Sequence, residues 1–310
     1  MSEIPIAVFV HVHYPEIWRT ISERLSQRLY LPFHLVLTSS QAEGTIILPK
    51  TRALLSVKTL LVENRGRDIL PFLRALADTG GFDLGLKLHT KKSPQRADGA
   101  QWLSDILDSL LPSSSGLNAI VAHMQADSRI GFVAPAGFCL SVKPWILQNA
   151  PGMSSIMTAI GVNLVERDLD DTYFAAGSMF WFRRSALAEL TDERLTRLFE
   201  AEEGQSDGTI AHAMERIFPV AARRRGFVSL AVPALTSSTP AMTTADLFDL
   251  ARRHADIPSR YFPGPYIPAS PHALATEEPR EQSWLKTTLS RYYSTLPLGL
   301  RGILRNLRGS

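Results

Sequence analysis

Cysteine is almost absent from this sequence, with one among 310 residues. A single thiol excludes a disulfide scaffold and any zinc or iron–sulfur site built from several cysteines. No stretch approaches the roughly 20 uninterrupted apolar residues that a transmembrane helix requires. The first residues lack the basic stretch of a signal peptide and are typical of a first strand. We therefore expect a cytoplasmic protein.

Neither sign of charge is in large excess. The 33 lysines and arginines exceed the 30 aspartates and glutamates by three, and the basic residues are not concentrated over the main body of the chain. No recognisable nucleic-acid-binding module is present, so we predict no nucleic-acid partner. Apolar residues make up 45% of the chain and charged residues 20%, which is ordinary for a globular protein.

Short apolar runs alternate with amphipathic stretches over the first 230 residues. The segment 4–10 is typical of a buried strand, and 16–29 of a helix with an apolar face. Further strands are predicted at 33–38, 59–63, 82–88, 131–135 and 174–182, the last with a kink at its Gly-Ser pair. Helices are predicted at 51–57, 69–77, 101–111, 116–126 and 207–218. This rhythm predicts an α/β fold with a parallel, doubly wound sheet, whose ligands bind beyond the carboxyl ends of the strands.

The composition changes after residue 232. We predict one domain over 1–232, a proline-rich linker or extension over 233–281, and a basic amphipathic tail over 282–310. The tail has five cationic and no acidic residues, interleaved with aromatic and aliphatic ones. This pattern is typical of a helix on a membrane surface, and equally of one that docks on a partner protein or on this chain's own core.

Three polar clusters follow predicted strands. In the first cluster, residues 63–68, the arginines suit phosphate or carboxylate and the glycine permits a tight turn. The equal alternative is that this cluster is only a solvated turn. The cationic groups of the second could cradle a diphosphate, although a basic run is usually just a solvated face. The histidines of the third could hold a metal ion, but no further ligands are obvious nearby, and a hydrogen-bonding role is favoured. These clusters are Glu63-Asn64-Arg65-Gly66-Arg67-Asp68, Lys87-Leu88-His89-Thr90-Lys91-Lys92-Ser93 and His11-Val12-His13.

Two later clusters are also candidates. A glycine in an aromatic run can allow a ligand close to the backbone, although aromatic residues in such runs usually belong to the core. Carboxylates at a helix start can act as general bases, or simply cap the helix and form surface ion pairs. These clusters are Ala176-Gly177-Ser178-Met179-Phe180-Trp181-Phe182-Arg183 and the segment 200–216, with Glu203, Asp207, His212, Glu215 and Arg216.

The motifs in 63–68, 87–93, 176–181 and 207–216, in this order, resemble those of the rhamnan synthesis protein F family. The resemblance covers roughly residues 5–230. It implies a bacterial glycosyltransferase of cell-wall or O-antigen polysaccharide assembly, with a single Rossmann-like nucleotide-sugar domain similar to that of A-type glycosyltransferases. It also suggests dTDP-rhamnose as the donor and a saccharide or polyprenyl-linked acceptor. With the amphipathic tail, it predicts a location at the inner face of the plasma membrane.

A-type enzymes often hold a divalent cation with an Asp-x-Asp motif. The predicted strand 82–88 leads instead into Lys87-x-His89-x-Lys91, while the aspartates of 168–171 are remote in sequence. We therefore predict that cationic side chains replace the metal on the leaving diphosphate, and that no cofactor is needed. The alternatives are a non-catalytic sugar-binding or scaffold subunit, and a metal-dependent hydrolase using His11 and His13.

These considerations assign a role to each candidate residue. The predicted catalytic residues are Asp207, as general base, then Glu203 and His212. The predicted donor-binding residues are His11, His13, Glu63, Asn64, Arg65, Gly66, Arg67, Asp68, Lys87, His89, Lys91 and Lys92. The predicted acceptor-binding residues are Gly177, Met179, Trp181, Glu215 and Arg216.

Overall fold

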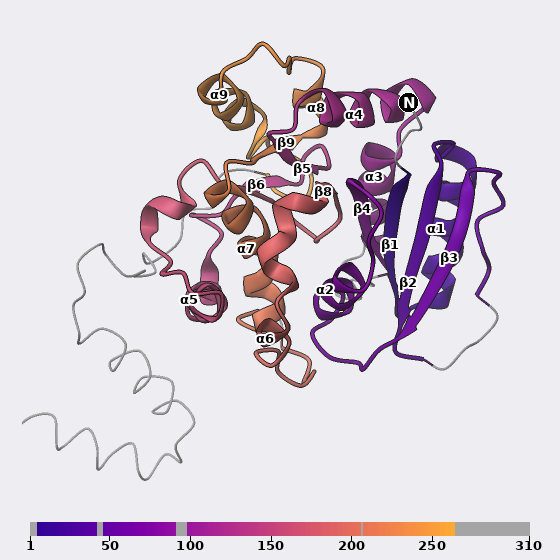
Figure 1. Cartoon of the computed structure of the whole chain (residues 1–310), viewed down its shortest axis with the longest axis horizontal. Helices are drawn as coiled ribbons and strands as arrows, with labels where there is room; N and C mark the ends of the chain where they lie inside the picture. The colour runs from indigo at the N-terminus through magenta and orange to yellow at the C-terminus, as the bar shows by residue number, and fades with distance from the viewer. Residues whose placement is uncertain (1–4, 42–45, 91–97, 206, 264–310) are drawn as a thin grey trace, which may run out of the picture. The chain divides into compact units, whose positions relative to one another are not determined.

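The computed structural model describes residues 5–41, 46–90, 98–205 and 207–263. Its centre is a seven-stranded sheet with the strand order β3-β2-β1-β4-β8-β5-β9 (Figure 1). All neighbours are parallel except β8, which runs antiparallel to β4 and β5. The strands are β1 (Ile6–Val12), β2 (Phe33–Ser39), β3 (Leu54–Leu61), β4 (Leu84–His89), β5 (Ile130–Ala134), β8 (Phe180–Arg183) and β9 (Val228–Ala231). The predicted α/β class is confirmed, with one antiparallel strand in the sheet.

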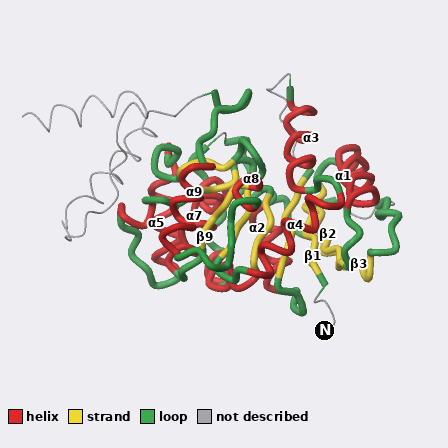
Figure 2. The backbone as a smooth tube through the Cα atoms, turned by 90° about the horizontal axis from the view of Figure 1, so that it is seen from above, coloured by secondary structure: helices red, strands yellow, loops and turns green. Residues whose placement is uncertain are grey.

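Helices cover both faces of the sheet, as the views in Figures 1 and 2 show together. Right-handed crossovers place α1 and α2 on opposite faces, because the chain passes outward from β1 to β3 and then returns to β4 on the other side of β1. The α-helices are α1 (Pro15–Arg28), α2 (Ile69–Ala77), α3 (Gly99–Leu110), α4 (Ser114–Ala126), α5 (Ala150–Ala159), α6 (Glu193–Thr196), α7 (Ile210–Arg224), α8 (Val232–Leu235) and α9 (Thr244–His254).

The core of the sheet is aromatic. All residues of β1 are buried, as expected for a parallel strand with helices on both faces. The ring of Phe9 in β1 lies 5.5 Å from Phe72 of α2, 5.4 Å from Phe82 and 5.9 Å from Phe182 of β8. These edge-on and tilted contacts join helix and strands, and so fix the position of β1 relative to α2.

One predicted element is wrong. The segment 51–57, predicted as a helix, overlaps the start of β3, where Leu54, Ser56 and Val57 pair with the first three residues of β2. The segment 174–182, predicted as a strand with a kink at its Gly-Ser pair, is divided at that pair into two strands, β7 (Tyr173–Ala175) and β8. Gly177 and Ser178 turn the chain between them with φ of 90° and 58°, and β7 pairs with β6 (Cys139–Ser141) in a separate two-stranded sheet. By contrast, α2 spans the predicted 69–77.

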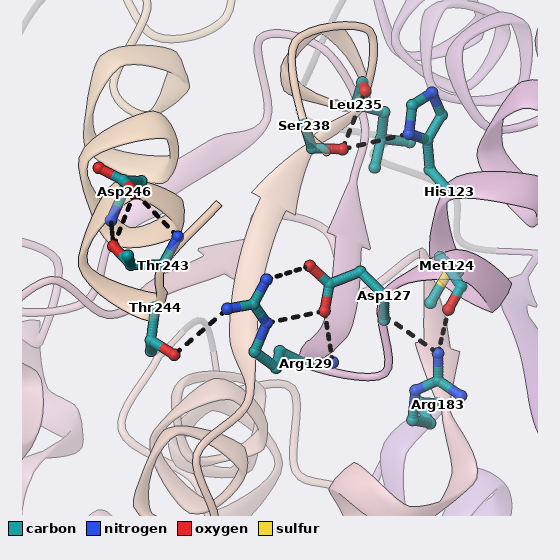
Figure 3. A network of polar contacts seen from close by, with 10 residues as sticks. All are labelled: His123, Met124, Asp127, Arg129, Arg183, Leu235, Ser238, Thr243, Thr244 and Asp246. Carbon is teal, nitrogen blue, oxygen red and sulfur yellow. Dashed lines mark hydrogen bonds and ion pairs between the residues drawn. The ribbon is translucent and has the colours of Figure 1, made fainter. Parts of the chain in front are cut away.

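The fold does not end at residue 232, where we predicted a linker. Helices α8 and α9 follow, and α9 buries Leu247, Leu250 and Ala251. Figure 3 shows how polar contacts fasten this segment: Arg129 binds Asp127 with Nη2–Oδ2 at 2.7 Å and donates to Thr244 Oγ1 at 3.5 Å. Residues 233–263 are therefore part of the folded body, while 264–281 and the predicted tail 282–310 lie outside the described residues.

None of the helices in the described part of the chain combines the length and the apolarity that a membrane span requires.

Candidate functional site

A cavity of about 300 Å³ lies at the carboxyl ends of β1 and β4. These neighbouring strands pair His11 with His89. Between β1 and β4 the order of the sheet reverses, because β2 and β3 lie on the far side of β1. Open α/β sheets bind their ligands at such a reversal. The cavity is lined by His11, His13, Tyr14, Asn64, Arg67, Asp68, His89, Thr90, Glu202 and Gly204.

Thr90 fastens the turn after β1 to the end of β4. Its Oγ1 accepts hydrogen bonds from the backbone N–H groups of His13, at 2.8 Å, and Tyr14, at 2.9 Å. Its own N–H donates to the carbonyl of His11 at 3.0 Å. The hydroxyl and the backbone of Thr90 therefore both help to hold the turn that precedes α1 and presents His13 and Tyr14 to the cavity.

His11 is a buried residue that forms part of the cavity wall. Its Nδ1 lies 3.0 Å from Thr38 Oγ1 of β2, and the side chain of His13 lies beside it with ring centroids 6.5 Å apart. Burial lowers the pKa of His11 to about 4, against a smaller opposing effect of Asp68. His11 is therefore neutral near pH 7 and can serve as a hydrogen-bonding group, not as a cation.

Lys87 lies beneath the cavity and is 1% exposed. Its Nζ contacts Asp68 Oδ2 at 2.5 Å, and donates to the carbonyl and the hydroxyl of Ser178 at 2.7 and 2.9 Å. We predicted that Lys87 binds the donor directly. That prediction is wrong for this conformation, because the ammonium group is engaged by Asp68 and Ser178 and closed off from solvent.

Lys87 joins two turns whose backbones are left-handed. Gly66 and Arg67 have φ of 67° and 55°, and Gly177 and Ser178 have φ of 90° and 58°. For residues other than glycine this conformation is strained, and such strain concentrates at functional sites. At Gly66 a Cβ atom would lie 2.5 Å from Leu70 Cβ, so only glycine fits there.

Arg67 points across the cavity to the segment before α7. Its backbone N–H donates to Glu202 Oε1 at 3.0 Å, its Nε lies 3.7 Å from Glu202 Oε2, and its guanidinium also donates to the carbonyl of Gln205. Asp68 and Glu202 both line the cavity. Among the described residues that line the cavity, one arginine, Arg67, thus faces two carboxylates, Asp68 and Glu202, whereas the sequence predicted a cationic cradle.

A narrow recess of about 30 Å³ adjoins the cavity and shares Arg67, Asp68 and His89 with it. Its far wall is the start of α7, with His212 and Glu215. His89 Nε2 lies 2.7 Å from the carbonyl of Gly177. The structure therefore brings together residues from all five clusters of the sequence, 11–13, 63–68, 87–93, 176–183 and 200–216.

Glu215 and Arg216 hold this wall in place. Glu215 accepts from the N–H of Gly177 at 2.8 Å and from Arg216 Nη1 at 2.8 Å. Arg216 is 6% exposed, with its guanidinium 4.8 Å from the ring centre of Phe174. Arg216 is therefore closed off from an acceptor in this conformation, which contradicts its predicted binding role.

Met179 and Trp181 were predicted to contact the acceptor, and the structure contradicts this. Both side chains are fully buried, and the indole of Trp181 donates to the carbonyl of Leu110 at 2.8 Å. Met179 directly precedes β8 and Trp181 lies on it, and β8 is an inner strand of the sheet, between β4 and β5. Their role is packing.

Five other candidates among the described residues are absent from the lining of this cavity and its recess: Glu63, Arg65, Gly66, Glu203 and Asp207. Glu203 is exposed. Glu63 forms ion pairs with Arg65, at 3.3 Å, and with Arg74, at 4.0 Å. Asp207 accepts from Asn149 Nδ2 at 2.9 Å, which orients its carboxylate beside the start of α7. Lys91 and Lys92 lie outside the described residues.

Four residues that line the cavity were not among the candidates: Tyr14, Thr90, Glu202 and Gly204. Thr90 and Tyr14 directly follow His89 and His13, so the end of each strand was a usable signal. Glu202 adjoins Glu203 in an acidic run, and nothing in the sequence distinguishes the two. Only the tertiary contact with Arg67 selects Glu202.

In the described ranges no group of three or more histidines, cysteines and carboxylates is arranged to hold a metal ion. The Asp-x-Asp pair at 168 and 170 is engaged elsewhere. Asp168 binds Arg224 Nη1 at 2.7 Å, and Asp170 lies 3.1 Å from Lys143 Nζ.

A family model described as rhamnan synthesis protein F matches residues 1–227 of this chain. The match extends over most of the chain, which therefore belongs to the rhamnan synthesis protein F family. The resemblance carried by the four motifs is confirmed.

The proteins WxcX of two strains of Xanthomonas campestris pv. campestris, described as uncharacterized, are 43% identical to this chain over 170 residues. The matched part is 53% of this chain and 24% of each relative, so the chain spans about a quarter of the length of these curated relatives. The crystal structure of S. aureus TarS 1–349 is 13% identical, with 70% of this chain and 55% of that chain aligned at a TM-score of 0.36. A superposition this loose carries no argument about chemistry.

Proposed function

We propose that this chain is a glycosyltransferase of polysaccharide synthesis. In this proposal it moves a sugar, rhamnose from dTDP-rhamnose, from a nucleotide donor to a growing cell-surface polysaccharide or lipid-linked acceptor. The observation that carries the proposal is the cavity at the reversal of strand order between β1 and β4, in a chain of the rhamnan synthesis protein F family. A cavity of this size lies at the lower end of the range for small-molecule sites.

The donor is proposed to occupy the cavity beside His11, His13, Asn64 and Arg67. The neutral imidazole of His11 and the amide of Asn64 suit the hydroxyl and carbonyl groups of a nucleoside or sugar. Arg67 and the lysines at 91 and 92 are proposed to face the diphosphate, where cationic groups stabilise the charge of the leaving group without a metal ion. The recess near His212 and Glu215 is proposed to be the side from which the acceptor approaches.

The donor is tested by the thermal stability of the full chain with a panel of sugar nucleotides, each with and without EDTA. A ligand that binds only the folded state stabilises it by RT ln(1 + [L]/Kd). We expect a rise with dTDP-rhamnose that EDTA does not change. A rise that EDTA abolishes and magnesium or manganese restores would contradict the metal-free site, and no rise with any nucleotide would favour a scaffold or sugar-binding subunit.

The general base is proposed to be Asp207, whose carboxylate is oriented by Asn149 beside the start of α7. We expect Asp207→Asn to lower turnover by orders of magnitude while donor binding stays largely intact. The matched variant is Glu202→Gln, which loosens Arg67 and is expected to weaken donor binding. Near-normal turnover of Asp207→Asn, with a large loss in Glu202→Gln, would transfer the role to Glu202.

A further inference from the structure

The outer edge of the sheet carries unusually exposed apolar side chains. Strand β3 is the last in the sheet order, and its Leu55, Val57 and Leu61 are 52%, 36% and 71% exposed. Ile47 and Leu48, in the segment that leads to β3, are 44% and 43% exposed. These five make up most of the large exposed apolar residues in the described part of the chain, and such concentration marks an interaction surface.

The backbone of β3 is also available for pairing. Within the described residues, β2 is its only neighbouring strand, so the N–H and C=O groups on its outer side have no strand to bond. A register irregularity affects the start of β3, and the strand is regular from Ser56 onward. Its one charged residue, Lys58, binds Asp78 with Nζ–Oδ2 at 2.7 Å, which removes much of the repulsion that a lysine normally gives an edge strand.

The side chains of β3 can complement those of a second copy of this chain. Val57, Thr59 and Leu61 alternate along the strand and therefore share one face of the sheet, the face of Leu35 and Leu37 in β2. A two-fold axis perpendicular to the sheet pairs two β3 strands antiparallel and keeps each face on its own side. The apolar row of one copy then meets the apolar row of the other.

We infer that two copies of this chain pair through β3, with the two-fold axis at Thr59. In this register Val57 lies opposite Leu61 of the second copy, Thr59 opposite Thr59, and Lys58 opposite Leu60. Apolar and Thr–Thr pairs across antiparallel strands are favourable, and no like charges meet. The result is one continuous sheet across the dimer.

The antiparallel arrangement points the carboxyl ends of the two sets of strands in opposite directions. Each copy therefore keeps its own cavity beside His11 and His89, with no residue contributed by the other. The pairing does not depend on the proposed glycosyl transfer, and either proposal can fail alone.

The chain is suited to a disulfide test, because its one cysteine, Cys139, is buried. Residues opposite each other in antiparallel strands have Cα atoms about 4.5–5.5 Å apart, within the range that a disulfide spans. We expect the Thr59→Cys variant of the full chain to form a covalent dimer under mild oxidation. The matched control is Ile257→Cys, at a position that is 48% exposed but not on β3, and it should stay monomeric.

The second measurement is the mass of the unoxidised protein by light scattering over a wide range of concentration. We expect a reversible dimer that the double variant Leu55→Lys, Leu61→Lys reduces to a monomer, with an unchanged thermal transition of the monomer because both side chains are over half exposed. A wild-type chain that is monomeric at all concentrations would overturn the inference. A dimer that survives the double variant, together with a Thr59→Cys variant that forms no covalent link, would overturn it equally.

Discussion

Lys87 illustrates how far the role of one residue depends on its surroundings. In the sequence it belongs to a basic run, and a basic run predicts a surface that faces an anion. In the fold it is 1% exposed and bridges Asp68 to the turn at Ser178. Its ammonium group therefore binds other groups of the protein, and it links the two left-handed turns beneath the cavity.

We expect Lys87→Met to destabilise the protein by about 3–5 kcal/mol, since it removes the buried cation that Asp68 contacts. The loss is measured as the free energy of unfolding in urea. The matched control is Lys143→Met, which removes a lysine that is 48% exposed and pairs with Glu166 and Asp170. Its expected cost is below about 1 kcal/mol. Equal costs for the two variants would show that Lys87 does not support the turns.

The pKa of His11 makes stability depend on pH. The folded state holds this pKa at about 4, below the ordinary 6.5, so the unfolded chain binds more protons between these values. The contribution of His11 is fully present above pH 6.5 and is lost as the pH falls toward 4, by roughly 3 kcal/mol in total. Urea unfolding from pH 4 to 7 should show a shallower dependence for His11→Gln. Parallel curves for the two proteins would contradict a neutral, buried His11.

At the scale of elements, the turn between β3 and α2 places Arg67 and Asp68 at the cavity. The left-handed Gly66 reverses the chain, and the start of α2 packs directly on it. The sequence predicted α2 with its bounds, because its apolar residues repeat with the helical period. It could not predict that Arg67 also adopts a left-handed conformation, because the contact with Glu202, far along the chain, supports that conformation.

We expect Gly66→Ala to destabilise the protein more than Gly81→Ala. Both glycines have positive φ, 67° and 78°, so both variants bear the backbone strain of about 1–2 kcal/mol. A Cβ at Gly66 also meets Leu70 at 2.5 Å and Phe199 at 2.6 Å, while nothing lies within 4 Å at Gly81. Thermal unfolding measures the difference. A Gly66→Ala protein as stable as Gly81→Ala would mean that the turn moves aside freely.

At the scale of the whole molecule, the amphipathic segment 282–310 is proposed to bring the chain to a membrane surface. Each lysine or arginine near an anionic surface contributes about 1 kcal/mol of attraction, and the segment has five. We expect deletion of 282–310 to release the protein from anionic liposomes in a flotation assay. Neutral liposomes serve as the control, and equal binding of the full and truncated chains to anionic ones would defeat the proposal.

The α/β class, the succession of the main strands and helices, and the clusters at the carboxyl ends of β1, β3 and β4 could be predicted from the sequence. Apolar periodicity and the ends of apolar runs are local properties, which can be recognised without knowledge of the fold. The segment 51–57 was misassigned, because its pairing with β2 depends on another segment. In 174–182 the Gly-Ser kink was predicted, but the pairing of its two halves in different sheets depends on other segments.

Which polar groups face the cavity depends on tertiary contacts that no local pattern in the sequence contains. Lys87 and Arg216 are closed off by partners from distant segments, Glu202 is selected over Glu203 by Arg67, and residues 233–263 join the body through contacts such as Arg129 with Thr244. Such choices depend on burial and on ion pairs between residues far apart in the chain. A residue's type states which bonds it can make, and the fold determines which partner it meets.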